Sequence, residues 1–135
     1  MSANEAIVLD TNIALDLLVF DDPGCAALAA ALEAGTLRWL VTAAMRDEFA
    51  RVLGYPIIVA RLAQKARDAR EVLAAFDART ERVDGVPPRA PCVCSDPDDQ
   101  VFIDLAVAHR ARLLSKDRAV LALRKRLAAW GVVVS

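Results

Sequence analysis

An apolar helix flanked by aspartates, within residues 94–117, is the feature that most constrains the fold of this 135-residue chain. Asp96-Pro97 is typical of a helix start, because aspartate caps the first turn and proline at the first helical position lacks only an N–H that would be unpaired anyway. We expect the helix to run to about His109. A short apolar segment then leads to Asp117. The stretch therefore predicts a buried helix followed by a strand, with carboxylates at both ends.

Asp99 lies on the core-facing side of this predicted helix. At about 100° per residue it falls in line with Phe102, Ile103 and Ala106. Asp104 points roughly the other way. An unpaired buried carboxylate is strongly disfavoured, so Asp99 must be paired, protonated or bound to a cation. Simple capping of the helix by the neighbouring aspartates is the alternative, and this stretch alone leaves both interpretations open.

Length and composition predict one domain, residues 1–135, with a core of its own. Hydrophobic residues make up 56% of the chain and aromatic residues only 5%, which suggests closely packed helices. Seventeen basic and eighteen acidic residues leave a net charge of −1, so any nucleic-acid binding must come from a local basic patch. No apolar run reaches the roughly 18 to 20 residues that span a bilayer, and no signal peptide is visible. We expect a soluble, cytoplasmic protein without membrane contact.

The chain has an odd number of cysteines, namely Cys25, Cys92 and Cys94. The spacing of the last two is too tight for a usual zinc pair, and the one histidine, His109, lies at a predicted helix end. These features argue against a zinc site. Reduced thiols in a cytosolic protein are the expected state.

Apolar runs alternate with helical segments along the whole chain. The expected strands cover residues 7–12, 37–41, 80–83, 113–114 and 132–134. The expected helices cover residues 13–20, 25–34, a segment capped by Thr42, residues 57–78 as one long helix or two shorter ones, residues 96–109, and a last helix with Val120, Leu123, Leu127 and Trp130 inward. Strands that alternate with helices favour a parallel sheet covered on both faces. We therefore predict an α/β fold, a three-layer α/β/α sandwich around a central, mostly parallel sheet.

This topology directs four carboxylates to one crevice. Asp10 and Asp117 directly follow strands, and ligands of open α/β sheets bind beyond the carboxyl ends of the strands. Asp99 opens one helix, and Glu48 borders the apolar stripe of another. Clustered carboxylates repel each other unless a divalent cation neutralises them, and oxygen ligands favour Mg²⁺ or Mn²⁺. Such a site suits metal-assisted hydrolysis of a phosphodiester. Helix capping by Asp10 or Asn12, and a partly buried salt bridge of Glu48, remain open as purely structural alternatives.

Four ordered motifs resemble those of the PIN domain (PilT N-terminus-like) family, and within it the VapC-like toxin components of toxin–antitoxin systems. They are Asp10-Thr11-Asn12 after a hydrophobic strand, Thr42 with Glu48 and Val52-Leu53, the stretch from Cys94 to Asp99 with Phe102, Leu105 and Ala106, and Ser115-Lys116-Asp117. Together they cover nearly the whole chain in the family's order. One departure is Lys116, since relatives often have Thr-Gly-Asp at the last motif. A bulky cation there either contacts phosphate or reduces metal occupancy.

The resemblance implies a site, a cofactor and partners. By it, Asp10, Glu48, Asp99 and Asp117 are catalytic residues that bind Mg²⁺ or Mn²⁺, while Asn12 and Ser115 orient ligands or water. The implied protein is a metal-dependent endoribonuclease that acts on RNA, the toxin of a pair restrained by an antitoxin, and a homodimer like many of its relatives.

Two groups of basic residues are candidate RNA contacts. One comprises Arg61, Lys65, Arg67 and Arg70, with Lys116 beside the site; the other, on the last helix, comprises Arg118, Arg124, Lys125 and Arg126. Mixed charges at helical spacing more often form a solvated face. Two other functions are alternatives: a regulatory PIN-like protein that binds RNA or protein without cutting, and a phosphatase of the haloacid dehalogenase type. The latter requires Asp-x-Asp after the first strand, where this chain has Asn12 in the second place.

Overall fold

The computed structural model describes residues 5–135 and places a four-stranded sheet at the centre. The strands are β1 (Glu5–Leu9), β2 (Leu37–Val41), β3 (Thr80–Arg82) and β4 (Arg112–Leu114). They are hydrogen-bonded in the order β3-β2-β1-β4, and every neighbouring pair is parallel. The last three residues of β1 and of β2 are buried, as expected for apolar strands covered on both faces.

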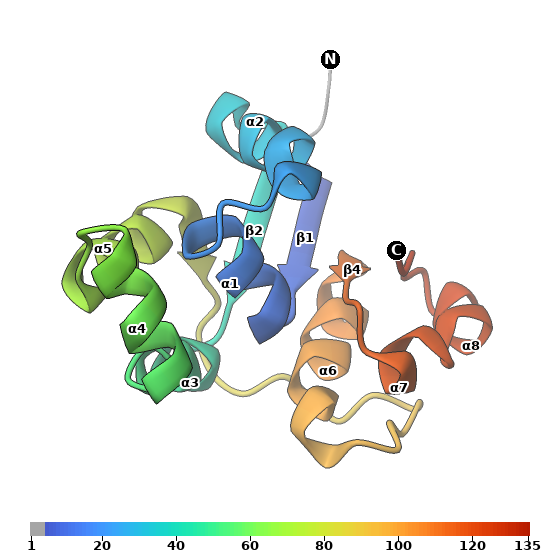
Figure 1. The fold of residues 1–135 in the computed structure, drawn as a ribbon. Helices are drawn as coiled ribbons and strands as arrows, with labels where there is room; N and C mark the ends of the chain where they lie inside the picture. Colours follow the sequence, from blue (N-terminus) through green and yellow to red (C-terminus); the bar gives the residue numbers. More distant parts are fainter. Residues whose placement is uncertain (1–4) are drawn as a thin grey trace.

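Helices connect the strands and cover both faces of the sheet (Figure 1). The helices between β1 and β3 are α1 (Thr11–Leu18), α2 (Ala26–Ala34), α3 (Ala43–Val52), α4 (Pro56–Gln64) and α5 (Ala69–Arg79). Helix α6 (Gln100–His109) joins β3 to β4, and α7 (Arg118–Leu121) and α8 (Arg124–Ala128) follow β4. The chain moves from β1 through β2 to β3 and then returns past β1 to β4, so right-handed crossovers place α1 to α5 on one face and α6 on the other. The predicted three-layer α/β/α fold is confirmed.

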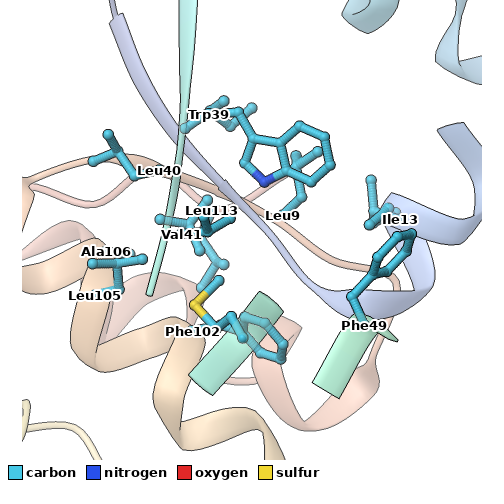
Figure 2. Close-up of a cluster of buried hydrophobic side chains, with 14 of the residues drawn as sticks. Leu9, Ile13, Trp39, Leu40, Val41, Phe49, Phe102, Leu105, Ala106 and Leu113 are labelled. Atoms are coloured by element: carbon cyan, nitrogen blue, oxygen red, sulfur yellow. The ribbon is translucent and has the colours of Figure 1, made fainter. Parts of the chain in front are cut away.

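An aromatic cluster fills the core between the sheet and the helices that follow β1 and β2. The rings of Trp39 and Phe76 meet edge to face with their centroids 5.0 Å apart, and Phe49 stacks on Phe76 at 4.6 Å. Figure 2 shows Trp39 and Phe49 gathered in one buried cluster with Ile13 and Phe102. Offset and edge-to-face pairs of this kind stabilise a core beyond the area they bury. The core thereby fixes α1, α3 and α5 against the sheet.

The helical segment predicted over residues 57–78 is two helices. α4 ends at Gln64, and Asp68 begins α5 by accepting a 2.9 Å hydrogen bond from the amide of Glu71. Ala66 between them has a φ of 52°, a left-handed conformation that L-residues rarely adopt. Alanine favours helix, so Ala66 does not predict the break between the two helices.

The predictions for the C-terminal end of the chain were partly wrong. The single last helix is two short helices, and Trp130, expected to point inward, lies beyond α8 with 48% of its surface exposed. The expected closing strand over residues 132–134 is reduced to an isolated bridge between Leu113 and Val134. The helical period that predicted Trp130 does not extend past Ala128, which explains the error.

The helix predicted from Asp96 begins differently from the expectation. Pro97–Asp99 form a 3₁₀ turn, η2, and the α-helix starts only at Gln100. Asp96 caps this turn, as predicted, by accepting a hydrogen bond of 3.0 Å from the amide of Asp98. All three cysteines are free thiols. Within residues 5–135 no helix is long and apolar enough to cross a membrane.

Candidate functional site

The carboxyl ends of β1 and β4 meet at a switch in the order of the sheet. The chain leaves β1 toward β2 on one side, whereas β4 lies on the other side of β1. The amide of Asp10 donates a 3.2 Å hydrogen bond to the carbonyl of Leu114, so both strands end at the same level. Crevices at such switch points are the usual ligand sites of open α/β sheets. Asp10 and Asp117 both enter this crevice.

A pocket with a volume of about 770 Å³ opens at this edge of the sheet. All four predicted catalytic carboxylates line it: Asp10, Glu48, Asp99 and Asp117. Asn12, which is exposed on the first turn of α1, lines it as well. Residues far apart in the sequence thus converge as the order of strands and helices predicts.

Three of the lining carboxylates form a tighter group. Asp96, Asp99 and Asp117 each offer an oxygen that lies within 4.8 Å of the others. Sequence analysis had treated Asp96 only as a helix cap. Residues i and i+3 nearly eclipse each other in a 3₁₀ helix, so the η2 turn directs Asp96 and Asp99 to the same side. Asp96-Pro97 is typical of helix starts in general, so no signal in the sequence distinguishes this 3₁₀ turn from an α-helical first turn.

Asp99 holds the most unfavourable charge of the group. Burial, followed by the neighbouring carboxylate of Asp117, raises the pKa of Asp99 from 3.8 to about 7, and Asp96 and Asp10 act in the same direction. Its Oδ2 atom is buried and has no hydrogen-bond partner among the described residues. A buried oxygen is normally satisfied, and a cation bound by the three carboxylates would satisfy this one. The donor set, oxygen only and strongly anionic, fits Mg²⁺ or Mn²⁺.

Asp10 is held rigidly at the back of the pocket with only 3% of its surface exposed. Its Oδ1 accepts a 2.9 Å hydrogen bond from the amide of Ile13, so it does cap α1, and its Oδ2 accepts one from the hydroxyl of Ser115. Burial raises the pKa of Asp10, although both hydrogen bonds lower it. Capping and a role in the pocket are nevertheless compatible, because each carboxylate oxygen has a second lone pair beside the one that accepts a protein hydrogen bond.

Glu48 lines the pocket, whereas Ser115 lies behind its wall and supports Asp10 and Asp117 from there. Ser115 is buried, and its Oγ accepts a 3.0 Å hydrogen bond from the amide of Asp117. Glu48 accepts a 3.1 Å hydrogen bond from the hydroxyl of Thr11. Among residues 5–135 no basic side chain forms a salt bridge with Glu48, so the salt-bridge alternative does not hold there. Thr11 is a second residue that sequence analysis missed.

The predicted RNA-binding residues occupy different environments. Lys65 forms a 2.7 Å salt bridge with Asp21, and Arg67 donates a 2.9 Å hydrogen bond to the carbonyl of Leu18. Arg61 lies 5.7 Å from the centre of the Phe20 ring. Arg70 is exposed.

Lys116 forms its ion pair outside the group of Asp96, Asp99 and Asp117. Its amino group pairs with Asp16 on α1, and it is not among the residues that line the pocket. This ion pair raises the pKa of Lys116. The cation beside the last motif therefore pairs with α1 instead of occupying the metal site.

The sequence model of the PIN domain matches residues 6–119. This chain belongs to the PIN domain family. Its fold is similar, with a TM-score of 0.62 and 15% sequence identity, to a chain in the crystal structure of VapBC2 from Rickettsia felis bound to a DNA fragment from its promoter. The match covers 96% of this chain and 97% of that chain. No curated protein matches the sequence. The predicted resemblance to PIN domains with a VapC-like fold is confirmed.

Proposed function

We propose that this PIN-domain protein is a Mg²⁺- or Mn²⁺-dependent endoribonuclease that hydrolyses RNA phosphodiester bonds. The observation that carries the proposal is the buried, unpartnered Oδ2 of Asp99 within a group of three carboxylates. A metal-free cluster of this kind is electrostatically unfavourable, as the raised pKa of Asp99 indicates. Such a cost is expected at functional sites more than at structural ones.

Each residue of the pocket receives a distinct role in this proposal. Asp96, Asp99 and Asp117 would hold the metal. A bound divalent ion would neutralise charge on the scissile phosphate and activate water. Asp10 and Glu48 face the same pocket and would complete the metal site or bind its water. Two further residues have supporting roles: Asn12 would donate a hydrogen bond to substrate, and Ser115 positions Asp10.

The proposal extends to a cellular role as the toxin of a toxin–antitoxin pair. The support is membership of the PIN family together with a fold like that of a chain in a VapBC2 complex. We propose a cytoplasmic homodimer that an antitoxin protein restrains. Growth arrest on induced expression, abolished by Asp99→Asn and relieved by a co-expressed neighbouring reading frame, would test the role. Light scattering of the purified protein would test the dimer.

The nuclease itself is tested by cleavage of a labelled single-stranded RNA with Mg²⁺ or Mn²⁺, with and without chelator. Wild type is compared with Asp99→Asn and with Asp47→Asn, an exposed aspartate on α3 that serves as a matched control. We expect metal-dependent cleavage by wild type and control and none by Asp99→Asn. If wild type binds metal and RNA but does not cut, the regulatory function replaces this one. Cleavage that survives both chelator and Asp99→Asn would exclude the proposed mechanism.

A further inference from the structure

The carboxylates occupy only one part of the pocket. A divalent ion with six waters, at about 30 Å³ each, fills roughly 200 Å³, whereas the pocket has about 770 Å³. The remaining wall is apolar and comes mainly from α1, α4 and the residues next to them: Leu15, Phe20, Val52, Tyr55, Ile57 and Phe102. The pocket therefore joins an anionic part, where a metal would bind, to an apolar part large enough for another group.

Tyr55 presents its ring to this apolar part from a fixed backbone. It lies between α3 and α4, where its amide donates a 3.0 Å hydrogen bond to the carbonyl of Val52. Its own carbonyl accepts hydrogen bonds of 2.9 Å from the amides of Ile58 and Val59. Pro56 follows at the first helical position of α4, where its fixed φ angle restricts the backbone further. Half of the Tyr55 surface is nevertheless exposed, and Tyr55 lines the pocket, so an aromatic residue on a fixed backbone is accessible to a ligand there.

A positive charge lies near the same apolar wall. The guanidinium of Arg61 lies 5.7 Å from the centre of the Phe20 ring, and Phe20 lines the pocket. Arg61 has no acidic partner within salt-bridge distance in the described part of the chain. Arg61 is not among the residues that line the pocket, so its charge lies beside the pocket, next to the Phe20 ring. A ligand that fits the pocket must therefore combine an anion for the metal with an apolar group for Tyr55, and negative charge next to that group would meet Arg61.

We propose that Tyr55 stacks a nucleobase of the RNA strand whose scissile phosphate lies at the carboxylate cluster, with Arg61 contacting a neighbouring phosphate. The inference rests on the proposed nuclease function and specifies its substrate as single-stranded at this point. Bases inside a duplex have no free face for a side chain, whereas unpaired bases stack on aromatic rings regardless of sequence. An acidic pocket alone would repel RNA, so contacts of this kind are needed to retain the strand.

The stack is tested directly by fluorine NMR, because Tyr55 is the single tyrosine of the chain. Protein labelled with 3-fluorotyrosine gives one resonance. The Asp99→Asn variant keeps the RNA uncut during titration with an octamer of uridine and with an abasic octamer of the same backbone. We expect the resonance to move with the uridine octamer and much less with the abasic one. A resonance that stays in place while fluorescence anisotropy shows saturation would overturn the stack and leave Tyr55 as a contact for a protein partner.

Kinetics give a second, independent test. Stacking on an aromatic side chain contributes about 1–3 kcal/mol per base, so Tyr55→Ala should lower kcat/KM for RNA about 5- to 150-fold, mainly through KM. Tyr55→Phe keeps the ring and should lose much less than Tyr55→Ala. Val59→Ala changes an equally exposed apolar residue of α4 that does not line the pocket, and it should stay within about twofold of wild type. An unchanged KM in Tyr55→Ala, with thermal unfolding like that of wild type, would contradict the proposal.

The two proposals can fail separately. If wild type shows no metal-dependent cleavage, the nuclease function fails, yet RNA binding by Asp99→Asn with and without Tyr55→Ala still measures the stack. Weaker binding of the double variant to uridine octamer, with equal binding of both to the abasic octamer, would support the subsite. Equal binding of both proteins to uridine octamer would reject it even if cleavage is confirmed.

Discussion

The hydroxyl of Ser115 donates a hydrogen bond to the buried Oδ2 of Asp10 and so joins the end of β4 to the end of β1. The same Oγ accepts the amide hydrogen of Asp117. One small side chain therefore fixes the carboxylate of Asp10 and the backbone of Asp117, two residues that line the pocket. A residue without a hydroxyl cannot form these two hydrogen bonds, which gives the serine of the Ser115-Lys116-Asp117 motif a structural role.

Replacing Ser115 by alanine should destabilise the fold. The Oδ2 of Asp10 would stay buried without its donor, and an unsatisfied buried polar group costs about 1–3 kcal/mol. Urea unfolding at neutral pH, with chelator present, measures the loss. Ser95→Ala changes an exposed serine and should remain within about 0.5 kcal/mol of wild type. Equal stability of both variants would show that Ser115 does not support Asp10.

The stability of the metal-free protein should fall as pH rises from about 4 to about 7. Asp99 has a folded pKa of about 7, above its ordinary value of 3.8. Between these values the folded state binds more protons than the unfolded state, so stability decreases with pH. Asp99→Asn removes this contribution and should reduce the drop in thermal midpoint between about pH 5 and pH 8.

Two comparisons make the pH experiment specific. Asp10, whose pKa is also raised by burial, contributes in the same direction, so some pH dependence should remain in Asp99→Asn. Asp47→Asn, at an exposed position on α3, should keep the full wild-type drop. A variant at Asp99 with unchanged pH dependence would mean that its carboxyl titrates normally in the folded protein.

Thr11 should act as a positioning residue for Glu48, provided that the nuclease function holds. The 3.1 Å hydrogen bond from its hydroxyl is the one contact that orients the carboxylate in the described residues. Losing such a partner of a metal-site residue typically costs 10- to 100-fold in metal affinity or activity. We expect Thr11→Val to lower kcat or metal affinity by about 10-fold with little change in the KM for RNA. Thr11→Ser, which keeps the hydroxyl, should restore the wild-type value.

The fold was predictable because its signals are local. Apolar runs such as residues 37–41 are strands, and Thr42 caps α3 through its side chain as its chemistry requires. The convergence of Asp10 and Asp117 followed from one rule, that parallel strands end at the same edge of a sheet. Short-range patterns and one topological rule were thus enough to predict that Asp10, Glu48, Asp99 and Asp117 line one pocket.

The remaining details depend on contacts that the sequence does not encode locally. Ala66 turns the chain in a left-handed conformation that would normally predict glycine. Asp96 joins the metal-site candidates only because residues 97–99 form a 3₁₀ turn instead of an α-helical one. The partner of Lys116, Asp16, lies 100 residues away on α1. Each of these features is decided by tertiary packing.

Removing the charge of Lys116 should have little effect on metal binding. Its amino group pairs with Asp16 and is 61% exposed at the side chain, and exposed pairs contribute about 0–1 kcal/mol. Lys116→Met should therefore change the affinity for Mn²⁺, measured by calorimetry, by less than about fivefold. A gain of tenfold or more would mean that the lysine competes with the metal for the carboxylates.

Basic residues that are free of acidic partners should contribute most to RNA binding. Arg118 is exposed, follows Asp117 directly and forms no salt bridge within the described chain, whereas Lys65 is paired with Asp21 at 2.7 Å. Each phosphate contact on a single strand adds about 0.7 to the slope of log K against log salt. Arg118→Ala should weaken binding of an octanucleotide and lower that slope by about 0.7.

Lys65→Ala is the matched comparison for Arg118→Ala. Asp21 already neutralises Lys65, so removing the lysine leaves Asp21 unpaired but takes away no phosphate contact. We expect binding to weaken slightly at low salt with an unchanged slope. The slope counts phosphate contacts, whereas a change in net charge alone shifts only the affinity. A lower slope for Lys65→Ala with an unchanged slope for Arg118→Ala would therefore place the RNA along α4 instead of α7.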